Sequence, residues 1–199
     1  MRVKLLLASS NAGKLKEFRA MAASLDCANK IELDLLPEFD ALPRFAEDAP
    51  TFAENAAGKA LHYSRFAEGM IVADDSGLAV PALGGSPGVR SARYAGENAS
   101  DPQRNEKLLA ELRGKTGDMR RAKFVCAIAA AKRGKMLAVV SGCVEGSIAE
   151  TPSGKGGFGY DPVFYFASAQ RTFAELSPAE KNDVSHRGKA FGRLCAALV

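Results

Sequence analysis

The chain has 199 residues, of which 47% are hydrophobic and 25% charged, and its formal net charge is +4. This length allows one domain with a sizeable core, with or without a subdomain. The basic residues are spread along the chain rather than gathered in blocks. Stable binding to nucleic acid is therefore not favoured, whereas an anionic substrate is compatible with the composition.

The four cysteines lie far apart and form no C-x-x-C pair, so we interpret them as small core residues in a reducing cytosol: Cys27, Cys126, Cys143 and Cys195. No stretch approaches the roughly 20 apolar residues that a membrane span needs, and the first apolar run is too short for a signal peptide. The sequence predicts a cytoplasmic protein without a membrane partner or a zinc site.

An anion-binding turn is predicted near the amino terminus. An apolar strand over residues 3–8 leads into a polar loop and then a helix, an order that directs backbone N–H groups and a positive dipole end at an anion. It is not a P-loop, because no glycine precedes Gly13 with four residues between them, and Leu15 replaces the magnesium-binding Ser or Thr. We predict phosphate binding with Lys14 as a point charge. The alternative is an ordinary turn with a solvated lysine.

A second strand is predicted over residues 31–36, followed by a long loop rich in proline and acids. Thr51 and the glutamate three residues later fit a capping box and predict a helix to about residue 67. Asn55 and Lys59 are four residues apart and share one face of this helix. Glu47, just before the cap, could face a metal ion or be a solvated loop acid.

The most informative stretch is a short apolar strand over residues 70–73 that ends at Asp74, Asp75 and then Ser-Gly. Adjacent carboxylates repel each other, so this position favours a divalent cation or a water molecule that needs a base. Alternatively, one acid caps a turn and the other is solvated. Side chains alternate along a strand, so the two acids share a face only if the chain turns between them.

The middle of the chain combines a glycine-rich loop, a helix and a hairpin. Residues 78–94 hold many glycines and prolines, which predicts a tightly folded functional loop. Asp101 is the predicted N-cap of a helix that ends at Gly114. Residues 122–131 and 136–148 then predict a long antiparallel hairpin.

The last quarter of the chain carries a second glycine-rich loop over residues 151–162, in which an exposed Phe158 could stack on a flat ring. A strand over residues 163–166 and a short helix near residues 177–181 follow. The last helix begins after Ser-His-Arg and buries Phe191 among other apolar side chains.

Six segments in this order closely resemble the inosine/xanthosine triphosphate pyrophosphatase family over essentially the whole chain. They are Ser-Ser-Asn-Ala-Gly-Lys at 9–14, Thr-Phe-Ala-Glu-Asn-Ala-Ala-Gly-Lys-Ala at 51–60, Ala-Asp-Asp-Ser-Gly-Leu at 73–78, Gly-Gly-Ser-Pro-Gly-Val-Arg-Ser-Ala-Arg-Tyr at 84–94, Gly-Gly-Phe-Gly-Tyr-Asp-Pro at 156–162 and Ser-His-Arg-Gly at 185–188.

The resemblance implies an α/β fold with an elongated mixed central sheet flanked by helices and a hairpin lobe, in a single domain over residues 1–199. It further implies a homodimer that uses Mg²⁺ to hydrolyse the purine nucleoside triphosphates ITP, dITP and XTP to the monophosphate and pyrophosphate. Such an enzyme cleanses the nucleotide pool and keeps these bases out of DNA and RNA.

The resemblance also implies roles for individual residues. Asp75 matches the general base and a metal ligand, and Glu47 matches a further metal ligand. Independently of the resemblance, the position of Asp74 beside Asp75 makes it a second candidate ligand at the strand. Because the family's glycine is missing from Glu47-Asp48-Ala49-Pro50, the loop acid could instead be Asp48 or Glu38. The substrate-binding matches, together with Lys59 as a phosphate charge, are Ser9, Ser10, Asn11, Ala12, Gly13, Lys14, Lys59, Ser76, Phe158, Gly159, Tyr160, Asp161, Lys181, His186 and Arg187.

Base selection would rest on donors that face the 6-keto oxygen of hypoxanthine or xanthine, for which His186 and Arg187 are the candidates. Two other functions are considered. A septum-inhibitor-type pyrophosphatase would act on pyrimidine or modified nucleotides but lacks the Ser-His-Arg and Phe-Gly-Tyr-Asp segments. A non-catalytic nucleotide-binding protein is disfavoured, because paired carboxylates repel phosphate unless a metal intervenes.

Overall fold

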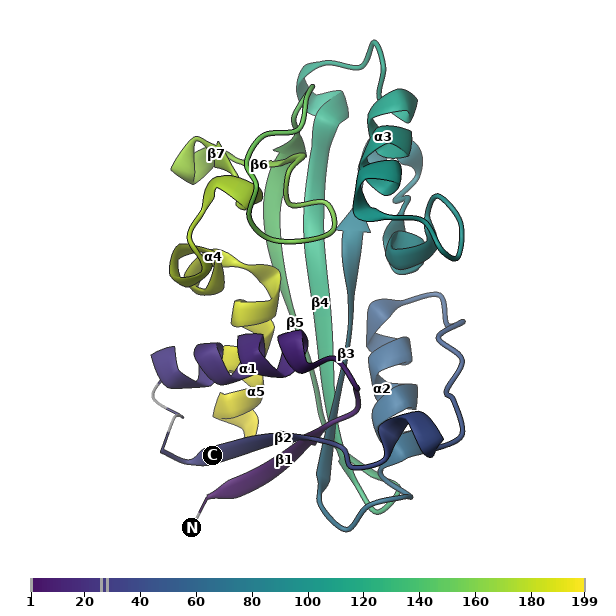
Figure 1. Cartoon of the computed structure of the whole chain (residues 1–199), viewed down its shortest axis with the longest axis vertical. Coiled ribbons are helices and arrows are strands. Elements are labelled where there is room, and N and C mark those ends of the chain that lie inside the picture. The colour runs from purple at the N-terminus through teal and green to yellow at the C-terminus, as the bar shows by residue number, and fades with distance from the viewer. Residues whose placement is uncertain (1, 26, 28, 199) are drawn as a thin grey trace. The chain divides into compact units, whose positions relative to one another are not determined.

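The computed structural model describes residues 2–25, 27 and 29–198. Seven strands form one mixed sheet in the order β2-β1-β3-β4-β5-β6-β7, with helices against it (Figure 1). The chain divides into two compact units, which we describe separately. Unit 1 comprises Met1–Asp75, Cys126–Gly142 and His186–Val199, and unit 2 comprises Ser76–Val125 and Cys143–Ser185.

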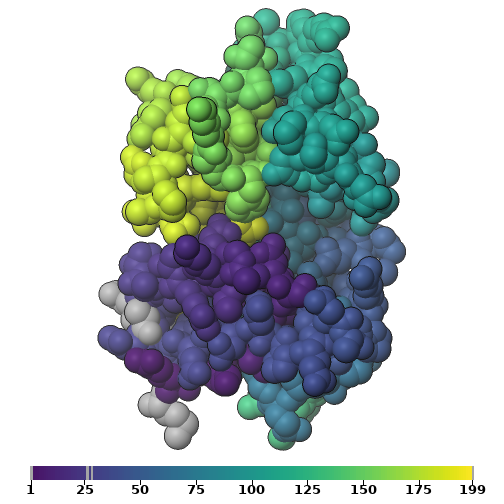
Figure 2. All heavy atoms as spheres, in the orientation of Figure 1, coloured from purple at the N-terminus to yellow at the C-terminus, as the bar shows by residue number. Residues whose placement is uncertain are grey.

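Unit 1 is built on parallel strands. β1 (Val3–Leu7) pairs in parallel with β2 (Ile31–Leu35) and with β3 (Met70–Ala79). Its helices are α1 (Ala12–Ser24), α2 (Phe52–Tyr63) and α5 (His186–Leu198), and η1 (Phe39–Ala41) is a 3₁₀ turn. The segment from β2 to α2 lies at the surface in Figure 2 and packs Phe39, Leu42 and Phe45 against the α2 side of the core.

The alternation of the strands gives unit 1 two apolar layers. Leu5, Leu7 and Val72 pack with α1 and α5 in one cluster, whereas Leu6, Ile71 and Ala73 pack with α2 in another. Successive residues of one strand therefore serve opposite faces of the sheet. This rule decides where the acids that follow Ala73 point.

Unit 2 contains shorter elements around a third apolar cluster. They are η2 (Pro81–Leu83), η3 (Gly88–Arg93), α3 (Asp101–Glu111), η4 (Gly117–Arg120), β6 (Phe164–Phe166), η5 (Ala167–Ala169), β7 (Arg171–Thr172), η6 (Phe173–Glu175) and α4 (Pro178–Val184). Leu108, Phe124, Phe164 and Phe173 are buried in this cluster. β3, β4 (Arg121–Lys132) and β5 (Lys135–Ile148) each have residues in both units.

The predicted hairpin is confirmed. β4 and β5 are neighbours in the sheet and are joined at Arg133-Gly134, whose φ angles of 49° and 73° suit a two-residue hairpin turn. The predicted strands near residues 3–8 and 31–36 and the helices after Asn11, Thr51, Ser177 and Ser185 are also present.

Two helix boundaries were predicted wrongly. α2 ends at Tyr63 rather than near residue 67, because the Ser64 hydroxyl donates to the Leu61 carbonyl and accepts from the Gly134 amide, which closes the helix end. The N-cap of α3 is Ser100, not Asp101, because Ser100 and Gln103 form the reciprocal capping box.

Two further predictions are corrected. β3 does not end at Asp74 but runs on through Asp75, Ser76 and Gly77 to Ala79. Cys143 is exposed on β5, whereas the other three cysteines are buried as predicted. Within the described residues, no helix is long and apolar enough to cross a membrane.

Candidate active site

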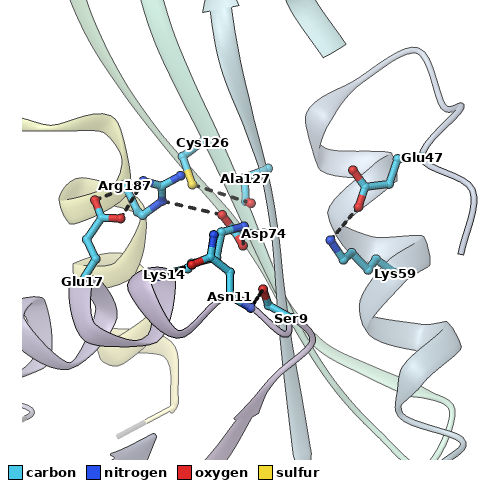
Figure 3. A network of polar contacts seen from close by, with 10 residues as sticks. All are labelled: Ser9, Asn11, Lys14, Glu17, Glu47, Lys59, Asp74, Cys126, Ala127 and Arg187. Atoms are coloured by element: carbon cyan, nitrogen blue, oxygen red, sulfur yellow. Dashed lines mark hydrogen bonds and ion pairs between the residues drawn. The ribbon is translucent and has the colours of Figure 1, made fainter. Parts of the chain in front are cut away.

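The turn between β1 and α1 is held by its own side chains. The Ser9 hydroxyl accepts from the Asn11 amide at 3.1 Å, and Asn11 Oδ1 accepts from the Lys14 amide at 3.0 Å, which caps α1 (Figure 3). Residues 10–13 are exposed. The predicted strand–loop–helix is confirmed as local structure, and the binding of phosphate to Ser9–Lys14 stays a prediction.

Asp74 lies in a chain of alternating charges within unit 1 (Figure 3). Its Oδ1 accepts from Lys14 Nζ at 2.8 Å, and its Oδ2 lies 3.6 Å from Arg187 Nε. Arg187 Nη1 in turn donates to both carboxylate oxygens of Glu17, at 3.1 and 3.0 Å. Lys14 and Arg187, which the sequence places 173 residues apart, are thus brought to the same carboxylate.

The charges of this network are strongly stabilised. Burial alone would raise the pKa of Asp74, but the charges of Lys14 and Arg187 and the hydrogen bond from Lys14 lower that pKa to about 2. Burial would lower the pKa of Arg187, and the charges of Asp74 and Glu17 reverse that effect and raise it. Asp74 therefore stays ionised throughout the physiological pH range.

Asp75 points to the opposite side of β3 from Asp74. Asn55 Nδ2 of α2 donates to Asp75 Oδ2 at 2.9 Å, and Asn55 Oδ1 accepts from the Ala49 amide at 2.9 Å. The sequence rule that adjacent strand residues face opposite sides is thus confirmed for this pair. One buried amide orients both the Asp75 carboxylate and the loop that carries Glu47.

Lys59 brings that loop acid to the same helix face as Asn55. Its Nζ donates to Glu47 Oε1 at 2.6 Å. Burial would lower the pKa of Lys59, but the charge of Glu47 and their hydrogen bond outweigh it, with smaller contributions from Asp74 and Asp75, so the pKa is raised. Lys59 is therefore a fixed positive charge among carboxylates.

The oxygen donors near α2 suit a hard cation. Mg²⁺ is usually bound by one or two carboxylates and completes its shell with waters and substrate oxygens. Glu47 and Asp75 supply two such carboxylates through contacts to one face of α2. Among the residues that the structure describes, no group of three or more His, Cys, Asp or Glu side chains could hold a metal ion by itself. A site completed by substrate fits this donor set.

In unit 2 the glycine-rich loop presents Phe158, whose exposed fraction is 53%. Lys181 Nζ lies 4.4 Å from the centroid of its ring and donates to Asp161 Oδ2 at 2.5 Å. Asp161 also accepts from the Phe158 amide at 2.8 Å. Lys181 is buried against these two partners, so its position supports the aromatic ring.

One member of the charge network, Glu17, was not found from the sequence. Glu17 lies one helical turn after Lys14 on α1, a spacing that signals a shared face, but its partner Arg187 is distant in sequence.

Three predicted substrate-binding residues are wholly or partly buried. His186 is buried at the start of α5, and Ser76 is half-buried in β3. Tyr160 is buried, and its hydroxyl donates to the Ser91 carbonyl at 2.8 Å.

A cavity of about 840 Å³ in unit 2 is lined by none of the predicted site residues. Arg120 in its wall donates to the backbone carbonyls of Ile148, Ala149, Leu112 and Lys115. This guanidinium is used to join the end of α3 to the end of β5, which is a structural role.

Comparison with known proteins gives one consistent answer. The chain is 49% identical over 191 residues to the dITP/XTP pyrophosphatase of Geobacillus kaustophilus, covering 96% of this chain and 92% of that protein. It is 46% identical over 192 residues to the dITP/XTP pyrophosphatase of Desulfotalea psychrophila, covering 96% of this chain and 83% of that protein.

Solved structures agree with these relatives. A HAM1 protein from Coxiella burnetii matches with a TM-score of 0.87 and 42% identity over 98% of each chain. The Ham1 protein of Staphylococcus aureus matches with a TM-score of 0.86 and 39% identity, over 98% of this chain and 97% of that one. The model of the Ham1 family matches residues 5–197. With nearly its whole length matched, and with the six ordered segments in place, the chain belongs to the Ham1 family.

Proposed function

We propose that this protein hydrolyses the deaminated purine nucleoside triphosphates ITP, dITP and XTP to the nucleoside monophosphate and pyrophosphate. One structural observation carries the proposal. β3 directs Asp75 to the α2 face, where Asn55, Lys59 and Glu47 lie, and sends Asp74 to the other face, where it holds Lys14. The relatives named dITP/XTP pyrophosphatase supply the substrate class.

In the proposed reaction a water oxygen forms a bond to the α-phosphorus, and the bond from that phosphorus to the oxygen bridging to the β-phosphorus breaks. Asp75 takes the proton of the attacking water, and Asn55 keeps the carboxylate oriented for it. Glu47 and Asp75 would hold Mg²⁺, which neutralises phosphate charge when bound. Lys14 and Lys59 stabilise the charge that develops on the leaving pyrophosphate.

Asp74 receives a different role from its neighbour. As a metal ligand it stays a prediction, but its contacts with Lys14 and Arg187 support a role in holding these two cations. A lysine ammonium has three N–H donors, so Lys14 can bind Asp74 and a phosphate together. Three loop acids are considered for the metal. Glu47 is supported because its ion pair with Lys59 holds it on the face of α2 that also carries Asn55.

The base is proposed to stack on Phe158 and to present its 6-keto oxygen to donors from His186 and Arg187. A phenyl ring that is 53% exposed offers a flat apolar face on which a purine can stack. Facing adenine, the same donors would meet an amine. The proposal further includes Mg²⁺ as the metal, a homodimer and a cytoplasmic location, for which the family resemblance is the support.

The test is the release of pyrophosphate with Mg²⁺ from a panel of triphosphates: ITP, dITP, XTP, GTP, ATP and TTP. We expect turnover of the first three with kcat/KM at least 100-fold above that for ATP. Preference for TTP would favour the septum-inhibitor-type alternative. Binding of ITP without release from any triphosphate would favour a non-catalytic nucleotide-binding protein and would contradict the proposal.

A further inference from the structure

Two side chains of helix α3 bind the backbone of one residue in the glycine-rich loop of unit 2. Asp101 Oδ2 accepts from the Gly159 amide at 2.6 Å, and Asn105 Nδ2 donates to the Gly159 carbonyl at 3.0 Å. Asp101 and Asn105 are four residues apart, so they lie on the same face of the helix. The N–H and the C=O of a single loop residue are thus both bound by side chains of one helix.

Gly159, which these two side chains bind, determines the direction of Phe158. The N–H of Gly159 belongs to the peptide group that joins it to Phe158, so the bond to Asp101 fixes the plane of that peptide. Gly159 has φ of 63°, in the left-handed region that most residues avoid. The loop bends at this residue, and the two bonds from α3 hold the bend in one orientation.

Both gripping side chains are themselves fixed. The other carboxylate oxygen of Asp101 is bound by Arg104, which also donates to the carbonyls of Ala99 at 2.6 Å and Ala92 at 2.8 Å. Asn105 is only 4% exposed. Because these side chains are fixed on α3, their hydrogen bonds can hold the loop in one conformation.

Asn105 also lines the cavity of unit 2. Its Nδ2 donates to the Gly159 carbonyl, whereas its Oδ1 has no hydrogen-bond partner among the described residues. The hydrogen bond that this side chain makes within the described part of the chain is therefore the one to Gly159.

The other side of the same loop is anchored separately. Asp161 accepts from the Phe158 amide and from Lys181, and Lys181 lies over the Phe158 ring. Phe158 is thus held on one side by Asp161 and Lys181, and on the other through Gly159. Without the α3 contacts, the support that Phe158 receives through Gly159 would be lost.

We propose that Asp101 and Asn105 are positioning residues that hold the Gly159 peptide and thereby keep Phe158 in the orientation that receives the purine. This inference rests on the proposed function, since it assigns a purpose to the stacking aromatic. Neither residue is assigned to touch substrate, metal or the reacting atoms.

The first test compares Asn105→Asp with Glu106→Gln, an exposed neighbour on α3. Asn105→Asp keeps the size of the side chain but places an acceptor against the Gly159 carbonyl. We expect KM for ITP to rise about tenfold with kcat within about twofold, because binding remote from the reacting atoms is lost. Glu106→Gln should leave both values unchanged. Asp101→Asn, which keeps an acceptor oxygen, should retain more affinity than Asp101→Ala.

To distinguish the positioning of Phe158 from a purely structural role, Asn105→Asp is repeated in a Phe158→Ala background. If α3 acts through Phe158, Asn105→Asp raises KM less than twofold once the ring is gone. A full tenfold increase in that background, or an equal fall in kcat in both backgrounds, would overturn the proposal.

Amide hydrogen exchange gives a readout that does not depend on activity. In Asn105→Asp and Asp101→Ala, the peptide covering residues 156–162 should exchange at least tenfold faster, while β4 keeps its protection. Unchanged exchange in that peptide would contradict the inference even if ITP is the substrate. Faster exchange in a protein that does not cleave ITP would overturn the proposed function and the link to base binding, but not the grip on Gly159.

Discussion

At the residue scale, adjacency in sequence separates two carboxylates in function. Asp74 and Asp75 share a strand, yet one binds Lys14 and the other Asn55, because strand side chains alternate. Asp75 therefore meets the helix that also fixes Glu47, whereas Asp74 is enclosed by cations. In the proposed reaction, Asp75 therefore takes the proton, and Asp74 orders Lys14 and Arg187.

Asp74→Asn is expected to lower the free energy of unfolding by about 3 kcal/mol, because it leaves Lys14 and Arg187 without the charge that compensates them. Urea denaturation measures the change. Asp34→Asn is the matched control, since Asp34 forms partly exposed pairs with Arg19 and Lys4 that should contribute less than about 1 kcal/mol. Equal effects at the two sites would show that the Asp74 network adds no more to stability than a partly exposed ion pair.

Arg187→Ala tests the choice of base. If the guanidinium reads the 6-keto oxygen, the ratio of kcat/KM for ITP over ATP should fall at least tenfold, because a donor matched to the keto group is lost. Glu17→Gln serves as a companion, since it removes the charge that Arg187 binds through Nη1 while leaving the arginine in place. An unchanged ratio in Arg187→Ala would exclude Arg187 as the reader.

The sequence predicts the local parts of the site better than the long-range ones. The shared face of Asn55 and Lys59 and the opposition of Asp74 and Asp75 follow from periodicities of 3.6 and 2. The pairing of Arg187 with Glu17 does not, because it depends on how α5 packs beside α1. The grip of α3 on Gly159 has the same cause.

At the element scale, β5 and α5 approach so closely that only glycine fits between them. A Cβ on Gly142 would overlap the carbonyl oxygen of His186 and lie 2.5 Å from the Ala190 backbone nitrogen. Backbone atoms of a helix cannot turn aside as a side chain can. Gly142 thus sets the position of the first turn of α5, which carries His186 and Arg187.

Gly142→Ala should therefore destabilise the protein by about 1–3 kcal/mol and lower activity on ITP, because the start of α5 must shift. Gly192→Ala, which lies within α5 itself, is the contrast. There a Cβ would meet only Leu25 at 3.9 Å or more, so the better helix propensity of alanine should stabilise by up to about 1 kcal/mol. Thermal unfolding of the two variants checks the signs, and two shifts of the same sign would contradict this account.

The boundaries of elements are harder to predict from sequence patterns than the elements themselves. The Ser-Gly after the acids predicted the end of a strand, yet β3 continues to Ala79. In unit 2 a Cβ on Gly77 would lie 2.7 Å from the Gly88 carbonyl oxygen, and the Leu78 amide donates to Ser91 Oγ. This glycine therefore serves close packing against η3 rather than a turn, a distinction that depends on tertiary neighbours.

At the scale of the whole molecule, the mixed sheet and the family were both predictable, since the ordered segments extend over the full chain. The homodimer is a prediction from resemblance. Sedimentation equilibrium should give twice the chain mass of 21.0 kDa at micromolar concentration. A mass that stays at one chain across the concentration range would contradict it.

The central claim is that Asp75 drives the release of pyrophosphate from a deaminated purine triphosphate. The most direct measurement is the rate of pyrophosphate release from ITP by Asp75→Asn, beside wild type and the exposed Asp118→Asn. We predict a loss of at least 100-fold in kcat for Asp75→Asn, with a normal unfolding transition and no change for Asp118→Asn. Near-normal turnover by Asp75→Asn would contradict the account.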